Sequence, residues 1–290
     1  MADQAATLRN LVGQSNRYAK VITFASGKGG VGKSNIISNT AITLAGMGVR
    51  VAILDMDLGL ANLDILLGVS ARFNLTHVMS GQKKITDIII PGPNDIMFIP
   101  GASGVSRLAN LNEEERTFLI RSFADLESMA DIILVDTGAG LSDNVLQFAL
   151  SSQALVVVTT PEPTARMDAY ALIKTVHGKD GNIPIHVVVN EVTSEAEARR
   201  VYSSLNEVSR KHLSFKPELL GFLPCDPKIP AAVKMRRPFV LESPRSPASK
   251  AVGVLSADIK KLFLPNSGAG KDRVPKSFFS RLFSLLNRPA

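Results

Sequence analysis

The sequence has one cysteine, Cys225, among its 290 residues, so no disulfide can form within the chain. This excludes the disulfide-stabilised secreted proteins and is typical of a reducing compartment. The lack of paired cysteines also argues against an iron–sulfur carrier, which holds its cluster with several thiolates. The four histidines show no metal-ligand spacing and are interpreted as structural or surface residues: His77, His177, His186 and His212.

Long hydrophobic runs are also missing. No apolar stretch approaches the ~20 residues that a membrane-spanning helix needs, and the N-terminus has no apolar core of signal-peptide length. With 45% hydrophobic and 20% charged residues, the composition is that of a globular protein. The length suffices for one large α/β domain or two small ones. We therefore expect a cytoplasmic protein whose contact with a membrane is at most peripheral.

Acidic residues are outnumbered, and the formal net charge is +7. Residues 265–290 hold five basic side chains against one acidic one, a net charge of +4, which leaves +3 for the rest of the chain. A nucleic-acid-binding surface is more often a basic patch on the folded body. Because the excess lies mainly in the C-terminal tail, we expect no direct nucleic-acid binding.

A glycine-rich stretch at residues 26–34 reads Ser-Gly-Lys-Gly-Gly-Val-Gly-Lys-Ser. The apolar run 21–25 before it predicts a buried strand, and residues 33–46 after it predict a helix. A glycine loop between a strand and a helix is the context of a phosphate-binding loop, and Gly27–Ser34 fits the full pattern G-x-x-x-x-G-K-[ST]. The loop N–H groups and the positive end of the helix are therefore expected to hold a polyphosphate.

Within this loop, Lys33 is expected to lie along the β- and γ-phosphates, and the Ser34 hydroxyl to be a Mg²⁺ ligand. The predicted nucleotide-binding residues of the loop are Gly27, Lys28, Gly29, Gly30, Val31, Gly32, Lys33, Ser34 and Asn35.

Carboxylates follow two more predicted strands. The run 50–54 ends at Asp55 and Asp57, and the run 131–136 ends in Asp136. Acids at the carboxyl ends of parallel strands face the ligand crevice. Asp55 and Asp57 point the same way because they are two residues apart on a strand, so one can lie near the metal and the other near the γ-phosphate. Asp136 matches a Walker B aspartate, which is expected to hold Mg²⁺ through water.

Lys28 is a second lysine at the start of the loop, on the wrong side to duplicate Lys33, and it could reach a phosphate across an interface. With this lysine, the chain closely resembles the deviant P-loop ATPases of the MinD/ParA group over residues 20–264. The resemblance implies a single α/β P-loop NTPase domain with a mostly parallel central sheet and helices on both faces. It also implies ATP and Mg²⁺ as cofactors, slow ATP hydrolysis, and a homodimer in the ATP state.

The resemblance assigns roles to single residues. Asp57 matches the switch I aspartate that positions the hydrolytic water, so the expected catalytic residues are Lys28, Lys33 and Asp57, and the expected metal site is Ser34, Asp57 and Asp136. Asn190 follows the predicted strand 185–189 and matches the family's base-binding asparagine; a purely structural turn residue is the alternative. Pro224 and Asp226 match a Pro-x-Asp loop beside the adenine. Glu191 stands where the family commonly has arginine, which leaves the dimer contacts open.

The N-terminal segment Asp3–Arg9 reads Asp-Gln-Ala-Ala-Thr-Leu-Arg. It resembles the D-Q-A-x-x-L-R element of the flagellar-number ATPases of the FlhG (FleN, YlxH) family. In that family the element binds the GTPase FlhF and stimulates GTP hydrolysis, and a glutamine amide can orient an attacking water. The resemblance therefore predicts an FlhF-like partner bound through Asp3, Gln4, Ala5, Leu8 and Arg9. A frayed terminus is the plain alternative.

The C-terminal tail begins with a linker at residues 265–275 that is rich in glycine, serine, asparagine and proline. Residues 276–290 then predict an amphipathic helix, whose apolar side chains fall within an arc of about 160°: Phe278, Phe279, Leu282, Phe283, Leu285 and Leu286. Basic residues on the opposite side are typical of a helix lying on an anionic membrane. A helix docked on the body is the alternative, against which the linker and the adjacent phenylalanines argue.

The sequence thus divides into a partner-binding extension (1–20), an ATPase domain (21–264), a linker (265–275) and a membrane-targeting helix (276–290). The favoured function is an ATP-switched regulator of flagellar number and placement. We expect it to bind reversibly at the inner face of the cell membrane, with the cell pole as one option. The family also implies contacts with a flagellar switch (C-ring) protein and a transcriptional regulator. A division-site MinD is the alternative, and a DNA-partitioning ParA protein is disfavoured by the charge distribution.

Overall fold

The computed structural model describes residues 18–57, 63–101, 113–264 and 277–286. The predicted partner element at Asp3–Arg9 and the predicted linker 265–275 lie outside the described residues, as do residues 58–62 of the predicted switch I.

The described residues form one eight-stranded sheet with the strand order β3-β4-β2-β5-β1-β6-β7-β8. All neighbouring strands run parallel except β3, which pairs antiparallel with β4. This confirms the predicted mostly parallel sheet. The strands are β1 (Lys20–Ser26), β2 (Val51–Met56), β3 (Ile90–Pro91), β4 (Met97–Ile99), β5 (Ile132–Ala139), β6 (Ala154–Thr159), β7 (Ile185–Val192) and β8 (Glu218–Pro224).

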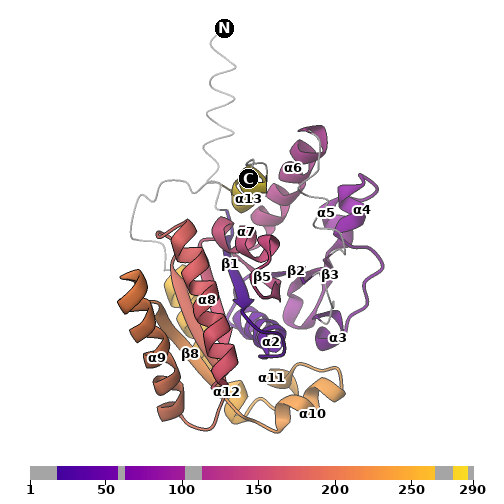
Figure 1. Cartoon of the computed structure of the whole chain (residues 1–290). Coiled ribbons are helices and arrows are strands. Elements are labelled where there is room, and N and C mark those ends of the chain that lie inside the picture. The colour runs from indigo at the N-terminus through magenta and orange to yellow at the C-terminus, as the bar shows by residue number, and fades with distance from the viewer. Residues whose placement is uncertain (1–17, 58–62, 102–112, 265–276, 287–290) are drawn as a thin grey trace.

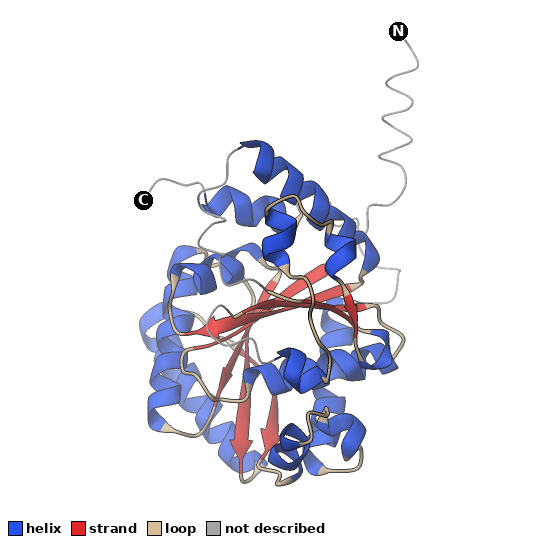
Figure 2. Cartoon of the chain, turned by 90° about the vertical axis from the view of Figure 1, so that its right-hand side faces the viewer, coloured by secondary structure: helices blue, strands red, loops and turns tan. Residues whose placement is uncertain are grey.

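Helices cover both faces of the sheet, as Figure 2 shows with the strands between two helical layers. On one face the sheet packs against α2 and α12, with α3, α10 and α11 alongside: α2 (Lys33–Gly46), α3 (Leu63–Leu67), α10 (Lys228–Lys234), α11 (Phe239–Glu242) and α12 (Pro247–Phe263). The other face carries α4 (Leu75–Met79), α5 (Ile85–Ile88), α6 (Glu113–Met129), α7 (Asp143–Ser151), α8 (Pro163–Lys179), α9 (Glu195–Leu213) and α13 (Phe278–Leu286). A short 3₁₀ turn, η1 (Pro93–Asp95), precedes β4.

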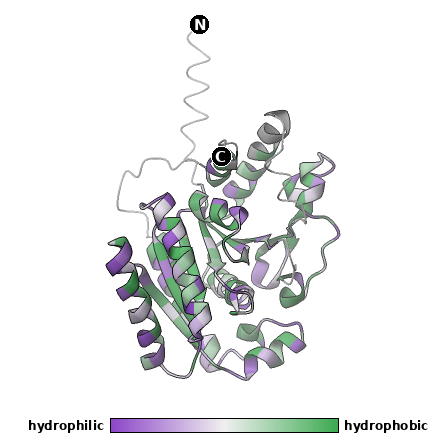
Figure 3. Cartoon of the chain, viewed as in Figure 1, coloured by the Kyte–Doolittle hydropathy of each residue, from purple (hydrophilic) through white to green (hydrophobic). Residues whose placement is uncertain are grey.

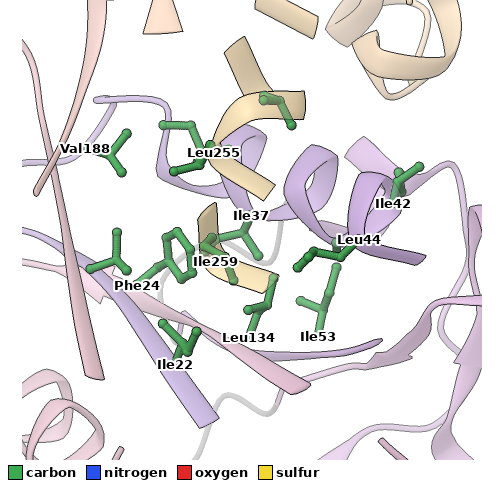
Figure 4. Close-up of a cluster of buried hydrophobic side chains, with 14 of the residues drawn as sticks. Ile22, Phe24, Ile37, Ile42, Leu44, Ile53, Leu134, Val188, Leu255 and Ile259 are labelled. Atoms are coloured by element: carbon green, nitrogen blue, oxygen red, sulfur yellow. The ribbon is translucent and has the colours of Figure 1, made fainter. Parts of the chain in front are cut away.

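The central strands are apolar on both sides because helices cover both faces. Every residue of β2 and of β6 is buried, and the strands appear as hydrophobic segments in Figure 3. Phe24 of β1 meets Ile37 of α2 and Ile259 of α12 in the largest core cluster (Figure 4). Each such fully buried side chain contributes roughly 1.5–3 kcal/mol, so these contacts hold the two helices against the strands that carry the site.

Three consecutive isoleucines at residues 88–90 are typical of a strand, but Ile88 ends the short helix α5, and only Ile90 and Pro91 pair as β3. The helix is favoured because Ile85 and Ile88, three residues apart, bury the same face. The Asp87 carboxylate also accepts a hydrogen bond from the Lys84 N–H at 3.0 Å, which satisfies a free donor at the helix start.

Candidate nucleotide-binding site

The phosphate-binding loop joins β1 to α2 at the carboxyl edge of the sheet (Figure 1). β1 lies between β5 and β6, near the middle of the sheet. Gly30 and Gly32 adopt left-handed backbone conformations with φ of 80° and 83°, which only glycine adopts at low cost. A Cβ on Gly27 would lie 2.3 Å from the Asp168 backbone, so α8 approaches the loop too closely for a side chain. The loop therefore curls at the N-terminus of α2, whose dipole favours an anion.

Three predicted residues converge behind the loop. The Lys33 ammonium forms an ion pair with the Asp136 carboxylate, and the Ser34 hydroxyl donates a hydrogen bond to the same carboxylate. Burial raises the pKa of Asp136, while the Lys33 ammonium works in the opposite direction. The motif lysine thus neutralises a fully buried acid, and a bound phosphate would compete with Asp136 for this ammonium.

The strand β2 contributes two acids to the same edge. Burial and the Asp136 carboxylate raise the pKa of Asp55 to about 7. The Asp55 carboxylate accepts a hydrogen bond from the Asp57 N–H at 3.1 Å. A side chain at Gly138, near the end of β5, would lie 3.5 Å from the Asp57 Oδ1 atom, so Asp57 borders the end of β5. Both acids therefore lie close enough to Asp136 to interact with it electrostatically.

A Mg²⁺ ion fits this arrangement without an all-protein cage. Among the described residues, no group of three or more His, Cys, Asp or Glu side chains could hold a metal ion. Mg²⁺ in nucleotide sites needs only one or two protein oxygens and completes its shell with phosphate and water. The Ser34 hydroxyl and the Asp136 carboxylate supply such hard oxygen donors, with Asp57 close enough to influence Asp136 electrostatically.

Beside the phosphate loop lies a pocket of about 420 Å³. Its wall is formed by Gly30, Gly32, Asn35, Ile36, Asn190, Glu191, Leu223, Pro224, Cys225, Asp226, Pro227, Ile229, Pro230 and Phe239. The predicted base-binding residues Asn190, Pro224 and Asp226 are thus brought together. Sequence reasoning missed the contributions of α10 and α11, because no motif marks the apolar residues that line a base.

Asn190 connects the pocket to the phosphate loop. Its Nδ2 atom donates a hydrogen bond to the Val31 carbonyl at 2.9 Å, while its buried Oδ1 atom has no protein partner. A buried acceptor without a partner is costly, and an amide oxygen can accept from the exocyclic amino group of a base. The site therefore fits a purine with an amino group.

Asp226 has a mainly structural task in this wall. Its carboxylate accepts hydrogen bonds from the N–H groups of Lys228 at 2.9 Å and Ala248 at 3.1 Å. Burial opposes ionisation, but these bonds and one from Ser246 hold the pKa of Asp226 below its ordinary value. Asp226 thereby joins the starts of α10 and α12 at the rim of the pocket.

The Lys28 side chain extends from the phosphate loop to the start of α8. Its ammonium lies 2.6 Å from the Glu162 carboxylate and 3.1 Å from the Thr164 hydroxyl. Hydrogen bonds from Lys28 and Thr164 hold the pKa of Glu162 below its ordinary value. Sequence reasoning missed Glu162; the signal was the Pro161-Glu162-Pro163 segment directly after β6, at the same carboxyl edge.

The tail helix α13 is docked on the body, which is the alternative that the sequence left open beside a helix lying on a membrane. Four of its predicted membrane-facing residues are buried against α6 and α7: Phe278, Phe279, Leu282 and Phe283. Phe279 stacks on Phe123 with ring centroids 3.7 Å apart. Leu285 is half-buried, and the Leu286 side chain lies outside the description. Docking is favoured because the exposed apolar arc would otherwise face water.

A buried carboxylate caps the start of this helix. Glu127 of α6 is fully buried, and its Oε1 atom accepts a hydrogen bond from the Ser277 hydroxyl at 2.8 Å. The backbone N–H groups of Phe278 and Phe279 also donate to this carboxylate. Burial nevertheless raises the pKa of Glu127, with Arg281 working the other way. Glu127 thus satisfies the free donors at the N-terminus of α13.

The docked helix also contacts elements of the nucleotide site. Met56 is the last residue of β2 and directly precedes Asp57. Its side chain points to the side of the strand opposite to Asp55, where it lines a small apolar gap with Phe279, Leu282 and Phe283. The helix α7, on which α13 packs, begins at Asp143, shortly after the glycines that follow Asp136. Movement of either segment would therefore disturb the seat of the tail.

Residues 22–239 match the CobQ/CobB/MinD/ParA nucleotide binding domain family. The chain is 36% identical to the antiactivator FleN of Pseudomonas aeruginosa over 87% of this chain and 90% of FleN. It is 33% identical to the flagellum site-determining protein YlxH of Helicobacter pylori over 99% of this chain and 100% of YlxH. The fold is similar to that of the septum site-determining protein MinD from Pyrococcus horikoshii complexed with Mg-ADP (TM-score 0.66, 26% identity, 84% of this chain and 97% of MinD).

Proposed function

The chain belongs to the MinD/ParA family of P-loop ATPases, among relatives that include FleN and YlxH, and from this premise we propose that it is an ATP-switched regulator of flagellar number and placement. One observation carries the proposal: an ATPase site whose loop lysine, Lys28, faces outward, in a chain similar to two flagellar proteins over most of its length.

The residues of the site have distinct tasks in ATP hydrolysis. Lys33 leaves Asp136 to neutralise the β- and γ-phosphates, and Ser34 and Asp136 would hold Mg²⁺, which would supply positive charge against the charge that develops on the phosphates. Asp57, which borders the end of β5, orients the attacking water and accepts its proton. Asn190 and the apolar wall of the pocket hold the base and so position the triphosphate for the reaction.

ATP binding is proposed to bring two copies together face to face. Lys28 is held by an exposed Glu162 rather than by its own phosphate site, so it has to leave only this surface pair to contact a nucleotide on a second copy. Exposed ion pairs contribute little stability. A triphosphate on the facing copy can therefore compete with Glu162 for the Lys28 ammonium.

The docked tail is proposed to be the resting state of the membrane switch. Four large apolar side chains of α13 are buried in the docked state, and each contributes roughly 1.5–3 kcal/mol when buried, whether in protein or in lipid. The two burial sites are therefore closely balanced, and a change at Met56 or α7 can shift the helix from one to the other. Two released helices on a dimer would bind lipid far more strongly than one, through their effective concentration.

The N-terminal element is proposed to bind an FlhF-like GTPase through Asp3, Gln4, Ala5, Leu8 and Arg9. The resemblance of Asp3–Arg9 to the FlhG element supports this proposal, and a pull-down of the GTPase with and without residues 1–20 tests it. A division-site MinD is the second candidate, since it shares the ATPase body and an apolar tail. In the described residues no helix is long and apolar enough to cross a bilayer.

Size-exclusion chromatography with light scattering tests the switch directly. The full chain is compared with ADP, with ATP and with a non-hydrolysable ATP analogue, each with and without anionic vesicles. The proposal requires a dimer and vesicle binding only with the triphosphates. A chain that stays monomeric and unbound with every nucleotide would overturn it.

A further inference from the structure

The helices α10 and α11 carry an exposed basic and apolar surface at the end of the molecule opposite α13 (Figure 1). Residues 228–250 hold six lysines and arginines against one acid, Glu242, a net charge of +5. Lys228, Lys234, Arg236 and Arg245 are exposed there, together with Met235 and Leu241, which are 50% and 46% exposed. We call these six residues the α10–α11 surface.

Within the part of the chain that the structure describes, the charges of this surface form few ion pairs. Among the ion pairs of the described residues, only the neighbouring Arg237 is engaged here, with Glu242 at 3.3 Å. Lys228, Lys234, Arg236 and Arg245 take part in none of them. Without residues 228–250, the rest of the chain before the tail is slightly acidic, so this region stands out against the body.

Arg236 occupies a position that favours glycine. The N–H groups of Arg236 and Arg237 bond back to the carbonyls of Val233 and Ala232, which ends α10 in a Schellman motif. Arg236 itself is left-handed, with a φ of 54°. A non-glycine residue there costs about 1–2 kcal/mol. A strained, exposed and unpaired arginine is better explained by contact with an anion than by the stability of the fold.

The surface is also connected to the nucleotide site. Ile229, Pro230 and Phe239, from α10 and α11, line the base pocket. The Val240 N–H donates to the Asn39 side chain of α2 at 3.0 Å. A Cβ on Gly68, just after α3, would lie 3.1 Å from the Arg236 carbonyl. A partner bound to this surface would therefore contact elements that line the base pocket, that bond to α2, and that lie against Gly68 after α3.

We propose that the α10–α11 surface is a docking site for an acidic amphipathic segment of a partner protein. The basic side chains match acidic groups, and the exposed Met235 and Leu241 match apolar ones. DNA phosphates would leave these two side chains without a contact, and the surface shows no exposed aromatic side chain for stacking. A membrane is disfavoured because the tail leaves α12 at Phe263, about 25 Å along the helix from this surface.

The experiment selects a displayed library of random peptides of about four helical turns on the full chain without nucleotide, so that failure of the proposed ATP switch does not affect it. We expect enriched peptides that combine Asp or Glu with Leu, Met or Phe at helical spacing. Enrichment of peptides without this pattern would overturn the proposal.

Binding of a selected peptide is then measured on surface variants. Lys234→Glu/Arg236→Glu should weaken it about tenfold or more, and Met235→Ser/Leu241→Ser should weaken it as well. Lys211→Glu/Lys216→Glu, exposed on the far side of β8, changes the net charge equally and should have no effect. If this control weakens peptide binding as much as the surface variant does, the effect comes from net charge alone and the proposed site is wrong.

Two further arms separate the alternatives and guard against misfolding. Arg236→Gly removes the backbone strain, so it should raise thermal stability and still weaken the peptide; unchanged binding would overturn the role of Arg236. A short DNA duplex and phosphatidylglycerol vesicles replace the peptide in parallel. If either binds the wild type more tightly than the peptide does and loses binding in Lys234→Glu/Arg236→Glu, the protein-partner assignment is wrong. The coupling, which rests on the proposed function, requires that ATP change the peptide affinity; equal affinities with and without ATP would overturn it.

Discussion

The Lys28 ammonium lies 2.6 Å from the Glu162 carboxylate, across the carboxyl edge of the sheet between the phosphate loop and the start of α8. Thr164 holds the same carboxylate at 2.9 Å and the same ammonium at 3.1 Å. The lysine that is proposed to act on a second copy is therefore already positioned at the surface, and it is held there by a contact that solvent weakens.

Replacing Glu162 with Gln is expected to favour the ATP-bound dimer. The amide cannot form an ion pair, so Lys28 is released at lower cost, and the dimer should form at roughly two- to fivefold lower protein concentration. Sedimentation equilibrium with a non-hydrolysable ATP analogue measures this shift. Glu195→Gln, which breaks the exposed pair with Arg199 on α9, is the matched control and should leave dimerisation unchanged.

Replacing Lys28 with Ala is expected to spare nucleotide binding and to impair dimerisation. Its side chain points away from the chain's own phosphate site, so ATP affinity measured by titration calorimetry should change little. Light scattering with the triphosphate should then show a monomer. A normal dimer of Lys28→Ala would contradict the proposed role of this lysine.

Replacing Asp57 with Ala is expected to keep ATP bound and to trap the dimer on membranes. The change removes the group that orients the attacking water, and losing such a group typically lowers turnover 10²–10⁴-fold. Vesicle flotation with ATP should show persistent binding, and phosphate release should be lost. Rapid release from vesicles would count against the assignment of Asp57.

Replacing Asn190 with Ala is expected to weaken ATP and ADP alike. The change removes the bond to the Val31 carbonyl and the buried acceptor on the pocket wall, each worth about 1 kcal/mol. Nucleotide affinity should therefore fall on the order of tenfold or somewhat more. Discrimination between ATP and GTP should also narrow; an unchanged preference for ATP would assign base recognition to other residues.

Replacing Glu127 with Ala is expected to release the tail from the body. The change removes the acceptor for Ser277 and for the first N–H groups of α13, so the exposed fraction of Phe279 should rise. Hydrogen exchange of α13 and vesicle binding without nucleotide report this release. Glu127→Gln keeps an acceptor oxygen and should keep the tail docked.

The same carboxyl makes docking dependent on pH. Because burial raises the pKa of Glu127 in the docked state, protonation favours docking. This contribution is fully present below the ordinary pKa of a glutamate and is lost as the pH rises through the raised value. The tail of the wild type should therefore be held more tightly at acidic pH, and Glu127→Gln should remove this dependence. Release of the wild-type tail on acidification would contradict the argument.

Motifs marked the nucleotide site well because its chemistry depends on residues at fixed local spacing. Lys33 and Ser34 are adjacent in the loop. Asp55 and Asp57 follow the apolar run of β2, and Asp136 follows the apolar run 132–135 of β5. A parallel sheet brings such strand ends to one edge, so their meeting follows from the pattern. The meeting of Lys28 and Glu162 does not follow from the pattern, because five strands of the described structure, β2 to β6, separate the two residues along the chain.

The amphipathic pattern of the tail shows the limit of such reasoning. Winding residues 276–288 as a helix predicts one apolar face, and the described helix α13 has such a face. The pattern is the same whether that face meets lipid or protein. Only the folded body decides, through Phe123, Met56 and the buried Glu127, which together offer an apolar seat and a cap for the helix.

By itself, the sequence determined the phosphate loop, the acids at the strand ends and the α/β class, because hydrophobic period and glycine placement act over a few neighbouring residues. The tertiary structure alone decided that Lys28 is held by Glu162, that the tail is docked, and that α10 and α11 form one basic surface beside the base pocket. These relationships join residues far apart in the chain, and they depend on which faces the packed core leaves exposed.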